Sequence, residues 1–127
     1  MSQPDVLVVD DDAEIRESIA DLLRDEGYGT AVAAHGREAL EQLRGGVPAD
    51  LIVLDLMMPV MDGPTFRARQ RGEPDIAGIP VVVISAFQDV EDKAQRLGAT
   101  AALRKPISFR DLIETVRRLC APPFATA

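Results

Sequence analysis

The sequence predicts an α/β fold: a doubly wound, five-stranded parallel sheet with helices on both faces. Short runs of apolar residues, uninterrupted by polar ones, recur along the chain, as expected of parallel strands that are covered on both faces. Segments with apolar residues at helical spacing separate these runs, and such alternation is typical of an open parallel sheet. The chain has 127 residues, 46% of them hydrophobic, which suits one domain with a substantial core.

Five segments are predicted to be strands. Three are strongly apolar, and the second and fifth are weaker. In chain order they are Val6–Val9, Thr30–Ala34, Leu51–Leu54, Val81–Ile84 and Ala101–Leu103.

Four segments between or after the strands carry an apolar stripe at helical spacing. They are Ala13–Glu26, Arg37–Arg44, Gln88–Leu97 and Phe109–Leu119. Asp12 is expected to cap the first of them and Gly27 to end it in a left-handed conformation, while Ser108 is expected to cap the last. A fifth helix, which Gly63 is expected to start and which continues over Thr65–Arg71, is predicted mainly because parallel strands need a crossover, since apolar periodicity is weak there. The segment Gly72–Gly78 is expected to be a loop.

Composition excludes several classes of protein. The net charge of −7 argues against direct binding to nucleic acid or to an anionic membrane. The single cysteine, Cys120, rules out an internal disulfide, suits a reducing compartment and is expected to be a small core residue. No apolar run approaches the ~20 residues of a membrane span, and the N-terminus lacks the basic segment of a signal peptide. A cytoplasmic location is therefore expected.

Carboxylates follow two of the predicted strands. Asp10, Asp11 and Asp12 close the first run, and Asp55 ends the third. Acids gathered at one edge of a sheet repel one another and lose hydration, so a cation is expected among them. Mg²⁺ is bound by one or two carboxylates with waters and phosphate oxygens. Asp11 and Asp55 can supply these carboxylates, Asp10 can hold a coordinated water, and the carbonyl of Met57 can complete the shell. The alternative, that the acids only cap a helix, explains Asp12 but not Asp10 or Asp55.

Two further strand-end residues fall at the same edge, where open parallel sheets place their functional crevice. Lys105, before Pro106, is interpreted as a cation aimed at the acids, and the alternative is an ordinary solvated side chain. Ser85 closes the fourth apolar run, and its hydroxyl can donate to a phosphoryl oxygen. His35 is expected on the surface at a helix start and is assigned no chemistry.

A set of spaced motifs carries a family resemblance: Val-Val-Asp-Asp-Asp, Leu-Asp-Leu-Met-Met-Pro-x-Met-Asp-Gly, Ile-Ser-Ala and Arg-Lys-Pro. In this order they resemble the receiver domain of two-component response regulators, from Val6 to about Leu119. The resemblance implies the flavodoxin-like (CheY-like) strand order 2-1-3-4-5. It also implies a receiver domain over residues 1–121, followed at 122–127 by a C-terminal tail or the start of a linker.

Carried onto this sequence, the resemblance makes Asp55 the phosphoacceptor, with Ser85 and Lys105 binding the phosphoryl oxygens. The implied Mg²⁺ ligands are Asp10, Asp11, Asp55 and the backbone carbonyl of Met57. The implied phosphodonor is a sensor histidine kinase or a histidine phosphotransfer protein. A downstream output protein or domain would meet the face built from residues 88–119, and a phosphorylation-dependent dimer is compatible with this scheme. The resemblance implies a signalling protein and not a turnover enzyme.

One departure from the family stands out. The position three residues before the lysine usually carries Tyr or Phe as a rotamer switch, and here it is Ala102. Met57 and Phe87, which would flank the path of a hydrolytic water, can neither accept nor donate a useful hydrogen bond to orient it. A long-lived aspartyl phosphate is therefore expected.

Two rival functions are weaker. A Mg²⁺-dependent aspartyl-phosphate phosphatase-type enzyme would need a second acid two residues after the nucleophile, where Met57 stands, and an inserted cap domain. A flavodoxin-like nucleotide binder would need a Gly-rich phosphate loop where the chain has Asp10, Asp11 and Asp12.

Overall fold

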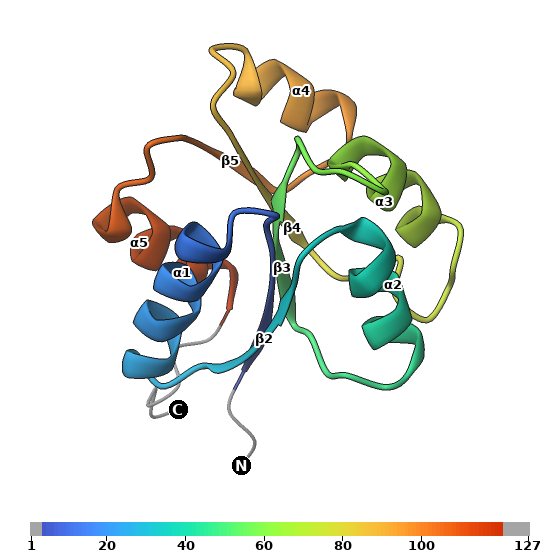
Figure 1. Ribbon diagram of the computed structural model, residues 1–127, viewed down its shortest axis with the longest axis horizontal. Helices are drawn as coiled ribbons and strands as arrows, with labels where there is room; N and C mark the ends of the chain where they lie inside the picture. The colour runs from blue at the N-terminus through green and yellow to red at the C-terminus, as the bar shows by residue number, and fades with distance from the viewer. Residues whose placement is uncertain (1–3, 121–127) are drawn as a thin grey trace.

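The computed structural model describes residues 4–120 and contains a five-stranded parallel sheet in the order β2-β1-β3-β4-β5 (Figure 1). The strands are β1 (Asp5–Val9), β2 (Gly29–Ala33), β3 (Leu51–Asp55), β4 (Val81–Ser85) and β5 (Ala101–Arg104). The helices are α1 (Ala13–Asp25), α2 (Gly36–Arg44), α3 (Gly63–Arg71), α4 (Val90–Arg96) and α5 (Phe109–Leu119). The predicted fold class and strand order are confirmed.

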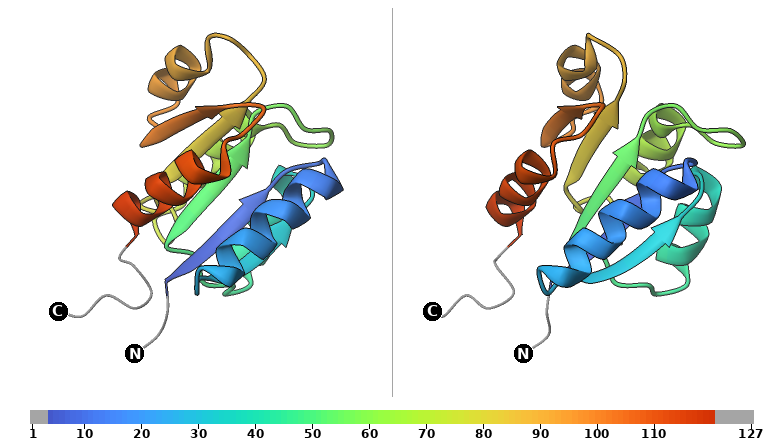
Figure 2. Two further views of the ribbon diagram at one scale, coloured as in Figure 1. Left: turned by 90° about the vertical axis from the view of Figure 1, so that its left-hand side faces the viewer. Right: turned by 60° about the vertical axis from the view of Figure 1, so that its left-hand side comes forward.

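The sheet separates two hydrophobic layers (Figures 1 and 2). Side chains alternate between the two faces along each strand, so Leu7 and Val9 join one layer while Val6 and Val8 join the other. Helices α2, α3 and α4 complete the first layer, and α1 and α5 complete the second. Because both faces are covered, β3 and β4 consist entirely of buried residues, which accounts for their apolar runs.

The helix ends follow the predicted chemistry. The Asp12 side chain accepts hydrogen bonds from the first turn of α1, Gly27 has a φ of 95°, and Ser108 caps α5. His35 caps α2 through its side chain, and Cys120 is buried. Helix α4 is shorter than its apolar pattern suggested, because residues 88, 89 and 97 form turns outside the helix.

Helix α3 begins at Gly63, the residue expected to start it, with Asp62 as its N-cap. Its weak periodicity has a structural cause. The residues that it buries include Arg67 and Gln70 beside Phe66, so its inner side is largely polar and a hydrophobic pattern is lost. The following segment forms turns and no regular element, as predicted.

No helix within residues 4–120 is long and apolar enough to cross a bilayer. The predicted domain boundary after residue 121 and the segment 122–127 lie outside the described residues.

Candidate functional site

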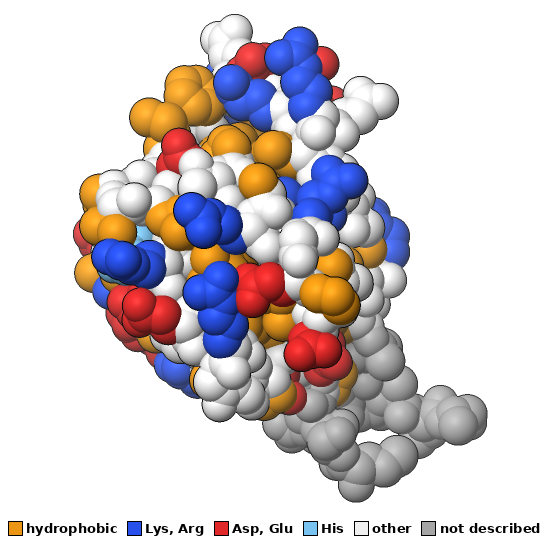
Figure 3. Space-filling model, turned by 90° about the vertical axis from the view of Figure 1, so that its right-hand side faces the viewer, with side chains coloured by type: hydrophobic (Ala, Val, Ile, Leu, Met, Phe, Trp, Pro, Cys, Tyr) orange, Lys and Arg blue, Asp and Glu red, His pale blue; other side chains and the backbone are white. Residues whose placement is uncertain are grey.

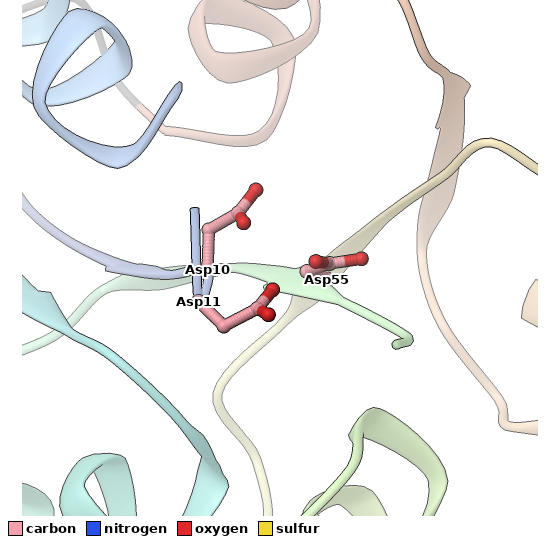
Figure 4. A group of neighbouring side chains, drawn as sticks. All are labelled: Asp10, Asp11 and Asp55. Atoms are coloured by element: carbon pink, nitrogen blue, oxygen red, sulfur yellow. The ribbon is translucent and has the colours of Figure 1, made fainter. Parts of the chain in front are cut away.

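Three carboxylates converge at the carboxyl edge of the sheet (Figure 4). Strands β1 and β3 are neighbours, with Val9 opposite Leu54. The residues at their ends, Asp10 and Asp11 on one strand and Asp55 on the other, therefore leave the sheet side by side. Oxygen atoms of the three carboxylates lie within 4.8 Å of one another. Asp10 and Asp55 are buried, whereas Asp11 is exposed. This arrangement can hold a metal ion.

Lys105 places its ammonium between two of these carboxylates. Its Nζ lies 3.1 Å from Oδ2 of Asp10 and 3.3 Å from Oδ2 of Asp55. Lys105 directly follows β5, and its backbone N–H donates to the carbonyl of Ser85 at 2.8 Å, which fixes where the side chain starts. The geometry favours the interpretation of Lys105 as a cation aimed at the acids over that of a solvated side chain.

The cluster is electrically unbalanced. Burial and the charge of Asp10 raise the pKa of Asp55 to about 6, although Lys105 and the backbone N–H of Met57 act in the opposite direction. Burial by itself would lower the pKa of Lys105, but its hydrogen bonds and ion pairs with Asp10 and Asp55 outweigh this and raise it. Three carboxylates face one ammonium, so a divalent cation would neutralise the remaining charge.

An open pocket of about 350 Å³ lies over Asp55. Ser85, buried at the end of β4, lines it, and Ser85 Oγ accepts a hydrogen bond from the backbone N–H of Phe87 at 3.1 Å. Met57 and Phe87 stand at the rim with 62% and 40% of their surface exposed. The N–H of Met57 donates to Oδ1 of Asp55 at 3.2 Å. Lys105 also lines this pocket, so carboxylate, hydroxyl and ammonium open into one space.

Two residues outside the predicted ligand set, Gly63 and Arg16, support the site. A Cβ on Gly63 would lie 2.7 Å from Leu56 Cα and 2.8 Å from the carbonyl oxygen of Asp55. Only glycine therefore lets α3 begin so close to the end of β3. Arg16 of α1 donates from Nη1 to the carbonyl of Asp10 at 2.9 Å. An arginine on an amphipathic helix is usually solvated, which is why this contact could not be predicted.

The family model described as the response regulator receiver domain matches residues 6–117. The chain belongs to the response regulator receiver family. The motifs that carried the resemblance lie inside the matched segment, and the family is that of two-component signalling proteins.

Relatives of this receiver domain differ in length. It is 37% identical over 129 residues to an uncharacterized 14.6 kDa protein of Leptolyngbya boryana, with 98% of each chain covered. It is 39% identical over 114 residues to the DNA-binding response regulator MtrA of Mycobacterium tuberculosis, covering 88% of this chain and 48% of MtrA. The receiver domain therefore spans about half the length of that regulator.

Solved structures show the same fold. The chemotaxis response regulator CheY4 of Vibrio cholerae has a TM-score of 0.85 at 33% identity, covering 93% of this chain and 99% of that chain. The receiver domain of the Francisella response regulator 1452 has a TM-score of 0.82 at 35% identity, covering 91% and 95%.

Ala102 occupies the position at which an aromatic residue was expected. Ala102 lies in β5 opposite Val83 and packs, partly buried, against the hydrophobic layer that contains Val90 and Ala94 of α4. The receiver domain thus has a methyl group on the α4 side of the sheet, at the position where the resemblance led us to expect Tyr or Phe.

Proposed function

We propose that this receiver domain accepts a phosphoryl group on Asp55 from the phosphohistidine of a sensor histidine kinase or a histidine phosphotransfer protein. One observation carries the proposal: a buried carboxylate opens into the same pocket as an ammonium and a hydroxyl, and two further acids lie beside it. An oxygen of Asp55 would attack phosphorus, the P–N bond would break, and its electron pair would return to the imidazole nitrogen. The product is an acyl phosphate.

The roles of the other residues follow from charge. Lys105 would bind a phosphoryl oxygen and offset charge during the transfer, which depends mainly on positioning and electrostatics. The Ser85 hydroxyl would donate to a second oxygen. Asp10, Asp11, Asp55 and the carbonyl of Met57 would hold Mg²⁺, and the carboxylates are the hard oxygen donors that this ion prefers. When bound, Mg²⁺ would neutralise the acids and allow an anionic donor to approach.

The output is proposed to pass through the face formed by α4, β5 and α5, which an output protein or domain would contact. The hydrogen bond from the Phe87 N–H to Ser85 Oγ supports this route. If the hydroxyl turns toward a phosphoryl oxygen, the loop that leads into α4 loses this contact. On this proposal the protein is a phosphoacceptor and not a turnover enzyme.

Acetyl phosphate with Mg²⁺ tests the acceptor directly. One phosphoryl group, stable in mild acid and lost in base, is expected by intact mass. Asp55→Asn should abolish it because an amide is not a nucleophile here, and EDTA should prevent it. Asp62→Asn is the matched control, since Asp62 caps α3 and asparagine caps equally well. Phosphate found on Ser85, or retained in Asp55→Asn, would refute the assignment.

A further inference from the structure

The inner side of α3 is polar where an amphipathic helix would be apolar. Arg67 is only 8% exposed and Gln70 is fully buried. Burying a guanidinium and an amide costs hydration, so these groups are tolerated only with satisfied hydrogen bonds. The other two arginines of α3, Arg69 and Arg71, are exposed, on a side of the molecule where Lys and Arg side chains are spread over the surface (Figure 3).

The Arg67 guanidinium binds the C-terminal end of α4. Its Nε donates to the carbonyl of Leu97 at 3.0 Å, and Nη2 donates to the carbonyl of Gly98 at 3.0 Å. Its third nitrogen, Nη1, donates to Oε1 of Gln70 at 2.8 Å. The amide of Gln70 in turn donates to two carbonyls in the segment that leads into β4. One connected network therefore joins α3, the end of α4 and the start of β4.

The charge of Arg67 has no carboxylate partner among residues 4–120. None of the ion pairs formed within residues 4–120 includes it, and burial and the neighbouring Arg71 lower its pKa. Its compensation comes from carbonyl oxygens at the end of α4, where a helix presents partial negative charge. The contact is directional, because a planar guanidinium forms these bonds in only one orientation.

The N-terminal end of α4 packs through the buried side chain of Val90 but, within residues 4–120, has no side-chain hydrogen bond to another element. The N-cap residue Asp89 makes no side-chain hydrogen bond to the described helix. A groove of about 310 Å³ runs between α4 and the loop after β3, and Met57, Phe87, Lys93, Arg96 and Leu97 are among its lining residues. Met57 and Phe87 also line the pocket over Asp55. Open space therefore lies along α4 from Lys93 to Leu97, and it is at the C-terminal end that side-chain hydrogen bonds from α3 hold the helix.

We propose that Arg67 and Gln70 are positioning residues that make the C-terminal end of α4 a pivot, about which phosphorylation moves the N-terminal end. This inference rests on the proposed function. Loss of the bond between Phe87 and Ser85 would release the loop beside the groove, and α4 would turn about the carbonyls that Arg67 holds. With Ala102 in place of an aromatic switch, the rotation of α4 carries the signal.

Amide hydrogen exchange by NMR, with beryllofluoride and Mg²⁺ as the phosphoryl analogue, tests the pivot. In the wild type, the analogue should change exchange in residues 86–93 and leave Leu97, Gly98 and Ala99 unaltered. In Arg67→Leu those three amides should exchange at least about tenfold faster, because two charge-assisted hydrogen bonds to this end of α4 are lost, and the analogue should now affect them. Arg69→Leu, the same change on the exposed side of α3, should behave as the wild type.

Two further variants keep the test decisive. Arg67→Leu leaves the Gln70 amide unpaired, so Arg67→Leu/Gln70→Leu removes both polar groups and should show the same release. Arg67→Lys keeps the positive charge but lacks the planar guanidinium that donates to both carbonyls, and it should also release the C-terminal end of α4. Equal changes along the whole of α4 in the wild type, or an unaltered pattern in these variants, would overturn the pivot. No change anywhere around Asp55 would instead overturn the proposed function, and the pivot with it.

Discussion

Replacing Asp55 with asparagine should stabilise the metal-free protein at neutral pH. The Asp55 carboxylate is buried, and burial together with the charge of Asp10 raises its pKa from 3.8 to about 6, despite the opposing effect of Lys105. Asparagine has nearly the same shape and no charge. The substitution therefore removes the unfavourable charge and keeps the packing at the end of β3.

The size of the effect follows from proton linkage. The folded state binds the Asp55 proton more tightly than the unfolded chain, so ionised Asp55 destabilises the fold. This penalty is absent below pH 3.8, grows until about pH 6 and is constant above. A shift of this size corresponds to roughly 3 kcal/mol. The pKa of about 6 already includes the favourable contact with Lys105, so the gain at pH 7 is up to about 3 kcal/mol, or up to about 10 °C in melting temperature.

Thermal unfolding in EDTA, followed by circular dichroism at pH 7 and pH 4, measures this gain. Asp55→Asn should melt higher than the wild type at pH 7, and the difference should nearly vanish at pH 4. Asp75→Asn, at an exposed position in the loop after α3, controls for the change in net charge. The reasoning fails if Asp55→Asn is no more stable at pH 7, or if its advantage persists at pH 4.

Four further outcomes are expected. Millimolar Mg²⁺ should raise the melting temperature of the wild type, because it binds only the folded state. Asp11→Ala should weaken this rise. If Mg²⁺ does not raise the melting temperature of the wild type, the metal site is contradicted. Lys105→Met should lower the free energy of unfolding by about 2–4 kcal/mol at pH 7, since buried carboxylates lose their cation. Urea titration should show a smaller loss at pH 4. An equal loss at both pH values would argue against this cause. Val60 has a φ of 67° and is 71% exposed, so Val60→Gly should stabilise by roughly 1 kcal/mol in the same assay. The phosphorylated variants Met57→Asn and Phe87→Glu should lose phosphate faster than the phosphorylated wild type, because polar side chains there can orient water. Equal decay rates would show that Met57 and Phe87 line the pocket without slowing hydrolysis.

The strands and most helices could be predicted because their signals are local. Residues 51–54 and 81–84 are buried on both faces of the sheet, and this burial appears directly in the sequence as unbroken apolar runs. Helix α3 gave no such signal because Arg67 and Gln70 occupy positions that face the interior. Their partners lie in other elements, so only the tertiary structure shows why polar residues are tolerated there.

Part of the candidate site could be predicted from local sequence signals, and part could not. The strand-end positions of Asp10, Asp55, Ser85 and Lys105 follow from the alternation of strands and helices. The contact of the Lys105 ammonium with both buried acids could not be predicted from this alternation. It depends on the register in which β4 pairs with β5 and on the residue at which each strand ends. The left-handed backbone of Val60 could not be expected either, since a β-branched residue disfavours it.

If the proposed pivot exists, the two-layered core has a consequence for any partner that binds this domain. How tightly the partner binds and how strongly its binding depends on phosphorylation would be set by contacts with different helices. Helices α4 and α5 border the same edge strand, β5, but pack in different hydrophobic layers. If α4 turns while α5 keeps its place, contacts with α5 contribute equally to binding both states. Such contacts tighten a complex without making it depend on phosphorylation, since a ligand shifts an equilibrium only by its difference in affinity. The extent to which a partner responds to the signal is then set by the fraction of its contacts that it makes with α4.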